Sequence, residues 1–248
     1  MQRLLNLAMG ILVALSYCSC RPVPHGNSGG DTKVPAPRPV TRQRIVCIDP
    51  GHPSEVNSGG TIQNGTTEVH IAWVVALKLK GILEAKGFNV IMTKSRENEL
   101  VRNIDRARVG NSSGAALMVR LHCDAGNDEG FAVYSPDRQA TKDNTTGPRL
   151  AVIEESKLLA EAIDREMSKK LVPDLKDGGV RGDSRTAIGS QQGALTASIF
   201  SQIPIVTIEM VVLSNKADAE FIKNDAGQQK MAHAVAAGIV SFVENQKQ

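Results

Sequence analysis

Short apolar runs rich in β-forming residues alternate with helical patterns along most of this chain, and this alternation constrains its fold more than any other feature. Five runs are predicted as strands, at residues 44–49, 88–93, 115–122, 130–135 and 203–210. Apolar residues at helical spacing predict helices after Thr67 and at residues 99–110, 151–171 and 227–245. Because helical crossovers join parallel strands, we predict an α/β fold with a twisted, mostly parallel sheet flanked by helices.

The length of 248 residues and the hydrophobic content of 41% suit one domain once the ends are set aside. Residues 1–20 are predicted to be a leader, because Arg3 precedes an apolar stretch at 4–15 that is too short to span a membrane comfortably. Residues 21–43 hold five of the eleven prolines and are predicted to be a disordered tether. Residues 44–246 are predicted to form the single folded domain.

Two cysteines, Cys18 and Cys20, follow the apolar stretch, where a cysteine resembles the lipidation site of a bacterial lipoprotein signal. Leu15 lies three residues before Cys18 as such signals prefer, whereas Ser19 provides the small residue before Cys20. The leader therefore predicts export to the periplasm or cell envelope, with a lipid anchor at one of these cysteines. An ordinary cleaved signal and a retained anchor remain alternatives.

Charge and aromatic content limit the partners. The net charge is +3, and the 29 basic residues are dispersed among 26 acidic ones without a basic stripe. Aromatic residues make up 3% of the chain. We therefore expect no nucleic-acid partner and no aromatic platform for sugars.

The other two cysteines, Cys47 and Cys123, raise the question of a disulfide, because an exported protein meets oxidising conditions. Cys47 lies inside the first predicted strand and Cys123 beyond the end of the third, an offset that exceeds the usual reach of a disulfide. Two buried free thiols are predicted.

Residues suited to zinc chemistry lie at or just after the carboxyl ends of three of the predicted strands: His52, His122 and Glu209. Sites in open α/β sheets form at the carboxyl ends of strands. Glu68 begins the first predicted helix, so His52, Glu68 and His122 form a candidate two-His, one-Glu zinc set with one coordination position left for water. Glu209, set among apolar residues, is then free to act as general base and acid.

Each of these residues also has a structural alternative. A lone histidine after a strand is usually a hydrogen-bonded loop residue, and Glu68 is a favourable partner of a helix dipole. His70 competes with Glu68 as a ligand, although the two point about 200° apart on a helix by its 3.6-residue turn. Asp124 is a candidate to orient His122 or the metal-bound water.

The alternative for Glu209 is an ion pair with Arg120 or Arg181. Two further segments, 136–149 and 176–192, are polar or rich in glycine and are predicted to be loops, the second long enough to fold over a cleft. The chain lacks a Gly-x-Ser-x-Gly elbow and a glycine-rich phosphate loop before a helix, which excludes the common serine-hydrolase and nucleotide-binding motifs.

Several blocks in order resemble the zinc-dependent N-acetylmuramoyl-L-alanine amidases of the amidase 3 family. They are IDPGH at 48–52, GTTE at 65–68, MTK at 92–94 with Leu100 and Arg106, LHCDA at 121–125, GVR at 179–181, and IE at 208–209 with LSN at 213–215. The resemblance implies that His52, Glu68 and His122 bind zinc and that Glu209 is catalytic. Pro53 to Glu55 and Met210 to Val212 depart from the family pattern, which affects the expected cleft shape and substrate preference.

The implied reaction is hydrolysis of the amide between the lactyl group of muramic acid and the L-alanine of the stem peptide in peptidoglycan. From its charge and position, Arg181 is predicted to contact a substrate carboxylate. Two rivals remain: a zinc peptidase acting within the stem peptide, and a wall-binding lipoprotein that keeps the metal without turnover. Whether an activator protein is needed is left open.

Overall fold

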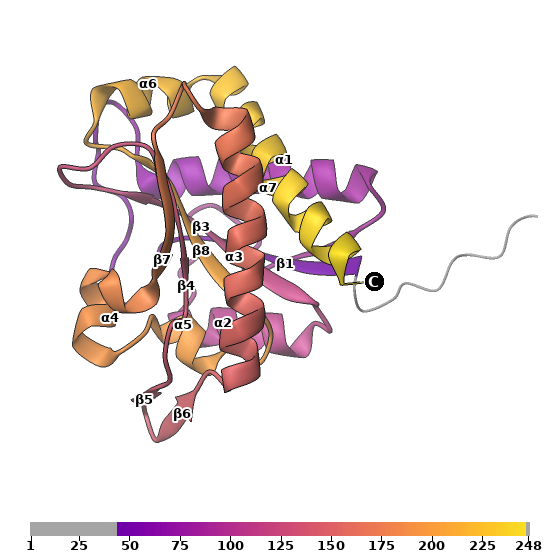
Figure 1. Ribbon diagram of the computed structural model, residues 1–248. Helices are drawn as coiled ribbons and strands as arrows, with labels where there is room; N and C mark the ends of the chain where they lie inside the picture. The colour runs from indigo at the N-terminus through magenta and orange to yellow at the C-terminus, as the bar shows by residue number, and fades with distance from the viewer. Residues whose placement is uncertain (1–43, 247–248) are drawn as a thin grey trace, which may run out of the picture. The chain divides into compact units, whose positions relative to one another are not determined.

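The computed structural model describes residues 44–246 (Figure 1). The predicted leader at 1–20, the tether at 21–43, and Cys18 and Cys20 lie outside the described residues. Among the described helices, none is both long and apolar enough to cross a membrane.

A six-stranded sheet forms the centre of the domain. Its strands, in spatial order, are β2 (Asn89–Met92), β1 (Ile45–Pro50), β3 (Leu117–Asp124), β8 (Ile205–Val212), β4 (Phe131–Ser135) and β7 (Asp177–Gly182). The first four are mutually parallel, whereas β4 runs antiparallel to β8 and parallel to β7. The predicted mostly parallel α/β fold is confirmed.

The reversed direction of β4 has a simple cause. Residues 125–130 alone connect β3 to β4, and a parallel connection needs a crossover of about a dozen residues or more. Because the connection is this short, β4 begins near the carboxyl end of β3. It therefore runs in the opposite direction to β3 and β8.

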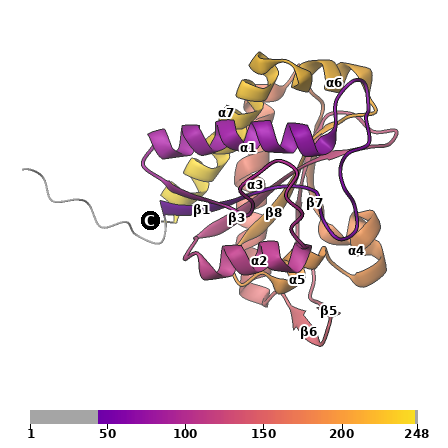
Figure 2. The ribbon, with the colours of Figure 1, turned by 180° about the vertical axis from the view of Figure 1, so that it is seen from behind.

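Helices cover both faces of the sheet (Figures 1 and 2). One face is covered by α1 (Glu68–Ala85), α3 (Leu150–Leu171) and α7 (Asp225–Asn245), with α6 (Lys216–Lys223) packed against α7. The other face carries α2 (Asn103–Ser112) and α5 (Thr196–Phe200), and α4 (Ala187–Gln192) lies on the same side in both views. The helices therefore enclose the sheet as the sequence pattern predicts.

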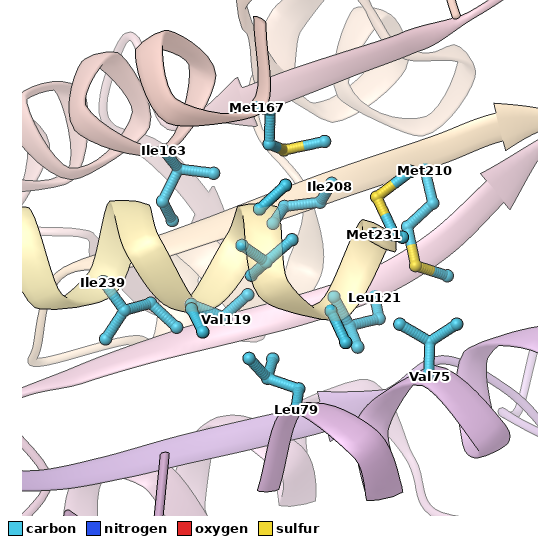
Figure 3. Close-up of a cluster of buried hydrophobic side chains, with 14 of the residues drawn as sticks. Val75, Leu79, Val119, Leu121, Ile163, Met167, Ile208, Met210, Met231 and Ile239 are labelled. Atoms are coloured by element: carbon cyan, nitrogen blue, oxygen red, sulfur yellow. The ribbon is translucent and has the colours of Figure 1, made fainter. Parts of the chain in front are cut away.

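The larger core lies between the sheet and the first set of helices (Figure 3). It contains Val119 and Leu121 of β3, Ile208 and Met210 of β8, Val75 and Leu79 of α1, Ile163 and Met167 of α3, and Met231 and Ile239 of α7. Successive side chains of a strand point to opposite faces. The residues between these core positions therefore point toward α2 and α5.

That second face is divided along the strands. Near their amino ends, Cys47, Met118 and Ile205 form a smaller apolar cluster with residues of α2 and α5. Toward the carboxyl ends the same face carries polar groups: Asp49, Arg120, His122, Thr207 and Glu209. The predicted site residues of the strands thus lie where the apolar packing ends.

Two segments expected to be loops contain regular structure. Residues 136–149 hold a hairpin of β5 (Ala140–Lys142) and β6 (Thr145–Gly147). Residues 176–192 hold β7, the 3₁₀ helix η2 (Asp183–Arg185) and α4. The loop predictions were wrong there because β7, with the sequence DGGVRG, is a half-exposed edge strand without an apolar pattern. Cys47 and Cys123 are buried free thiols on opposite faces of the sheet, as predicted.

Candidate metal centre

His52 lies in the loop that leaves β1, with its backbone in the left-handed region at φ 54°. A non-glycine residue in that region costs about 1 to 3 kcal/mol and persists only where neighbouring contacts fix it. The amide of Gly51 donates to the carbonyl of Leu121 (2.8 Å), and the Nδ1 atom of His52 lies 3.0 Å from the carbonyl oxygen of Asn57. These contacts set the direction of the imidazole.

Two buried cations, Arg106 and Lys94, donate hydrogen bonds to backbone carbonyls of the same loop. Arg106 donates from its guanidinium to the carbonyls of Pro50 (2.8 Å) and Pro53 (2.7 Å). Lys94 donates from Nζ to the carbonyl of His52 and to that of Glu97 (2.7 Å). Burial lowers the pKa of Lys94 to about 8, with the charge of Arg106 adding to the effect. The loop that presents His52 is therefore fixed by side chains from two separate segments.

Glu68 is the first residue of α1, which Thr67 caps by accepting a hydrogen bond from the amide of His70. One carboxylate oxygen, Oε1, lies 2.9 Å from His122 Nδ1 and accepts from the amide of Cys123 (3.2 Å). The other, Oε2, lies 3.2 Å from His52 Nε2. Burial alone would raise the pKa of Glu68, but the hydrogen bonds from both imidazoles hold it well below its ordinary value.

His122 lies near the end of β3, with its ring directly over Gly51. A side chain at position 51 would place its Cβ 2.6 Å from the ring, so only glycine allows this approach. The two imidazole rings pack edge to face, with centroids 5.0 Å apart. Burial lowers the pKa of His122 to about 4, which favours the neutral imidazole that binds metals. Its Nε2 atom is buried without a hydrogen-bond partner.

Glu209 lies on β8 directly opposite His122 in the parallel register. One of its oxygens, Oε2, is also buried without a partner. Burial, reinforced by the negative charges of Glu68 and Asp124, raises the pKa of Glu209 well above its ordinary value. Within the described residues it forms no ion pair, since Arg120 pairs with Asp49 and Arg181 with Asp128.

The register of β8 is irregular just after this residue. His122 pairs with Glu209, but Asp124 pairs with Val212, so β8 contains one extra residue in a β-bulge. As a result, Met210 and Val211 both enter the larger core. Bulges near the ends of strands change the direction of side chains. This bulge comes directly after Glu209.

His52, Glu68 and His122 therefore converge. Their ligand-type atoms all lie within 4.8 Å of one another, although the residues come from a loop, a helix start and a strand. Nitrogen and oxygen donors bind Zn²⁺ at about 2.0 to 2.2 Å, so ligand atoms around one ion lie about 3 to 4 Å apart. The spacing, the donor types and the unpartnered Nε2 of His122 fit a metal of this kind.

Two cavities meet at this group. A small polar cavity of about 280 Å³ is bounded by His52, Glu68, His122 and Glu209. A larger cleft of about 1100 Å³ shares three of these residues and continues over Arg120, Thr207 and Tyr134. Its walls include residues 185–192, which matches the expectation that this segment covers a cleft.

Other predicted residues lie apart from the three donors. His70 is half-exposed and contacts Glu97 at 3.2 Å, so the structure does not bring it to the group. Asp124 accepts from the amide of Ala125 rather than from His122, but it lines both cavities beside the three donors. Arg181 borders neither cavity, but its guanidinium donates to the hydroxyl of Tyr134 (3.2 Å), which lines the larger cleft.

A buried ion cluster, to which the sequence pattern alone gives no role, lies next to the site. Asp49 is fully buried and accepts from Arg106 (2.5 Å), Arg120 (2.8 Å) and Thr93. Asp49 and Arg106 belong to the blocks that resemble the amidase 3 family, which was the available signal. A structural role could not be separated from a functional one without the contacts.

Comparison with known proteins identifies the family. The model of the Amidase_3 family, described as N-acetylmuramoyl-L-alanine amidase, matches residues 46–241. The chain belongs to this family. Its enzyme class is therefore that of an amidase.

Relatives agree with this assignment over most of the domain. The chain is 24% identical to N-acetylmuramoyl-L-alanine amidase AmiA of Salmonella typhimurium, over 98% of this chain and 91% of that protein. It is 23% identical to AmiA of Escherichia coli, over 89% of this chain and 84% of that protein. The crystal structure of the amidase Ami1 from Mycobacterium smegmatis aligns with a TM-score of 0.69 at 23% identity, covering 84% of this chain and 99% of Ami1. The structural likeness supports the fold.

Proposed function

We propose that this protein hydrolyses the amide bond between the lactyl group of N-acetylmuramic acid and the L-alanine of the peptidoglycan stem peptide. Family membership supports the reaction class. The observation that carries the mechanism is the convergence of His52, Glu68 and His122 at one end of a cleft, with Glu209 in register beside His122. That cleft provides room for a substrate chain next to the reacting groups.

His52, Glu68 and His122 are proposed to hold a Zn²⁺ ion. When bound, the ion supplies a Lewis acid that polarises the scissile carbonyl and lowers the pKa of water to about 7. The chain prepares the ligands in advance: Asn57 and Glu68 orient the two imidazoles through their hydrogen bonds, and Glu68 is already ionised. Little rearrangement is needed for the three donors to bind one ion.

Glu209 is proposed to move the proton. As the water attacks the carbonyl carbon, the carboxylate accepts one of its protons and then donates that proton to the alanine nitrogen as the carbon–nitrogen bond breaks. The products are a lactyl carboxylate and a free alanine amine. A raised pKa suits a group that must both accept and donate a proton. Its unpartnered Oε2 is available for this purpose.

Export and anchoring are proposed from the leader. A domain that acts on peptidoglycan has to reach the cell envelope, and the apolar stretch at 4–15 followed by Cys18 and Cys20 supplies a route with a lipid anchor at one of the two cysteines. Mass spectrometry of protein from the membrane fraction tests this part. A cleaved N-terminus without lipid would contradict the anchor but leave the enzyme assignment untouched.

Digestion of purified sacculi tests the reaction. The expected products are peptide-free glycan and stem peptides with a free N-terminus on alanine, and addition of a chelator should abolish their release. Cleavage between two amino acids of the stem would instead favour the zinc peptidase. Binding to sacculi without any product, with the metal present, would favour the wall-binding lipoprotein.

Metal analysis tests the ligand set separately. The double variant His52→Ala, His122→Ala should lose the near-stoichiometric zinc of the parent, because two of three ligands are gone. The matched control is His233→Ala, an exposed histidine of α7 that contacts only Gln229. Unchanged zinc in the double variant would overturn the assignment.

A further inference from the structure

The cleft beside the candidate metal centre has two cations on one wall that the described residues leave without a charged partner. Within residues 44–246, the side chain of Arg185 forms no hydrogen bond and no ion pair, and that of Lys142 donates only to the neutral amide oxygen of Gln192 (3.3 Å). Several other exposed cations of the described residues contact a carboxylate, as Lys176 does with Glu129 (3.0 Å) and Lys230 with Asp174 (2.5 Å). Lys142 and Arg185 are therefore available to a ligand in the cleft.

The other charged groups that line the cleft away from the metal centre are mostly engaged. Arg102 pairs with Asp105 (2.7 Å), and Arg120 pairs with the buried Asp49 (2.8 Å). Glu55 accepts from the amide of Asn103 at the start of α2 (2.9 Å). Asp143, at the hairpin turn, is the remaining carboxylate on this wall. On this wall Lys142 and Arg185 carry positive charges and Asp143 a negative one, so the net charge of the wall is positive.

Lys142 and Arg185 lie at opposite ends of α4. Arg185 ends η2 shortly before α4 begins, and the contact with Gln192 places Lys142 at the end of α4. The six residues of α4 span about 9 Å at 1.5 Å per residue. An extended chain advances about 3.3 Å per residue, so this distance corresponds to two or three residues of a bound peptide.

Exposed apolar side chains line the same cleft as the two cations. Ile188 lines the cleft from α4 and is 41% exposed, while Val56 lines it from the loop after β1 and is 68% exposed. A cleft with two separated cations and exposed apolar groups is complementary to a short peptide with two carboxylates and small apolar side chains. The N-acetylated glycan is neutral, so it offers these cations hydrogen-bond acceptors but no opposite charge.

We propose that Lys142 and Arg185 bind two carboxylates of the peptide part of the substrate, so that the enzyme selects stem peptides with free carboxylates over their amidated forms. This inference rests on the proposed function. It assigns the wall formed by α4 and the β5–β6 hairpin to the peptide and leaves the glycan to the rest of the cleft. Charge-assisted contacts of this kind act mainly on substrate binding, so the selectivity appears in KM.

Two matched substrates test the proposal: a muramoyl tripeptide with free carboxylates, and the same compound with those carboxylates converted to primary amides. Two partly exposed ion pairs predict a kcat/KM ratio of about 5 in favour of the free acid. In the double variant Lys142→Gln, Arg185→Gln the ratio should fall to about 1, with each single variant between. The charge-retaining variant Lys142→Arg, Arg185→Lys should keep most of the selectivity, and high salt should lower it in the parent.

The control variant Arg96→Gln, Lys157→Gln removes two exposed cations outside the cleft and should keep the parent ratio. A parent ratio of about 1, or an unchanged ratio in the Lys142 and Arg185 double variant, would overturn the inference. Calorimetric binding of both compounds to the parent is measured alongside. A parent that prefers to bind the free acid but cleaves neither compound would contradict the proposed function alone, and a parent that binds neither would contradict both.

Discussion

Two groups of buried charged side chains lie next to each other on the same face of the sheet, and they differ in how completely they are paired. In the ion cluster, both oxygens of Asp49 accept hydrogen bonds, and Arg106 donates to Asp49 and to backbone carbonyls. In the candidate metal centre, His122 Nε2 and Glu209 Oε2 are buried and have no partner. Both groups are costly to bury, but only the first is fully compensated within the chain.

This difference distinguishes the structural role of the ion cluster from the functional role proposed for the metal centre. A fully paired buried ion cluster stabilises one arrangement of the chain, here the loop that carries His52. Unpartnered buried polar atoms call for a partner that the chain does not supply, such as water, an ion or a substrate. Burial of charge alone would have marked both groups as candidate sites. The missing partners distinguish them.

The largest expected effect comes from Glu209→Gln. If Glu209 transfers the proton, sacculus hydrolysis should fall about 10²- to 10⁴-fold. The free energy of unfolding should stay the same or rise, because an unpaired buried carboxyl is replaced by a neutral amide of similar shape. Product release and urea unfolding measure the two quantities. A loss of stability with activity retained would place Glu209 with the structural cluster and break the comparison.

The substitution Asp49→Asn should have the opposite effects: a large loss of stability, with zinc binding retained. Removing the carboxylate leaves Arg106 and Arg120 buried without their partner, so we expect a loss of about 3 to 5 kcal/mol in unfolding free energy. The control Asp174→Asn removes the partner of Lys230 at the surface and should cost less than about 1 kcal/mol. Zinc binding by the folded fraction should persist, and its complete loss would contradict a purely supporting role.

The lowered pKa of Asp49 predicts how the stability of the fold decreases at acid pH. Burial alone would raise the pKa of Asp49, but Arg106 and Arg120 hold it below its ordinary value of 3.8. A carboxyl with a depressed folded-state pKa contributes stability above its unfolded value, and that stability is lost as pH falls through the folded-state value. The parent should therefore lose stability below about pH 4 more steeply than Asp49→Asn. Parallel pH curves would contradict this contribution.

The smallest effect is expected for His70→Ala. Its contact with Glu97 joins two partly exposed side chains, so we expect a change of less than about 0.5 kcal/mol in unfolding free energy and no change in zinc content. Glu68→Ala, two residues earlier on the same helix, should lower zinc content. Zinc loss in His70→Ala would reverse the choice between the two residues that the sequence left open.

The sequence by itself determined the alternation of strands and helices, and with it the mostly parallel sheet. It also determined that His52, His122 and Glu209 lie toward or just beyond the carboxyl ends of strands, because each apolar run visibly ends at a polar residue. Parallel strand ends meet at one edge of a sheet, which is why residues so far apart in sequence could be grouped correctly in advance.

Only the tertiary structure decided between the alternatives for each residue. The sequence could not tell whether Glu209 pairs with Arg120, because pairing depends on the neighbouring Asp49, which takes that arginine. The bulge in β8 and the strand character of β7 were equally hidden, since register and edge pairing depend on strands brought together from distant segments. The cleft wall of α4 and the hairpin has the same origin: Lys142 and Arg185 come to its two ends only through long-range packing.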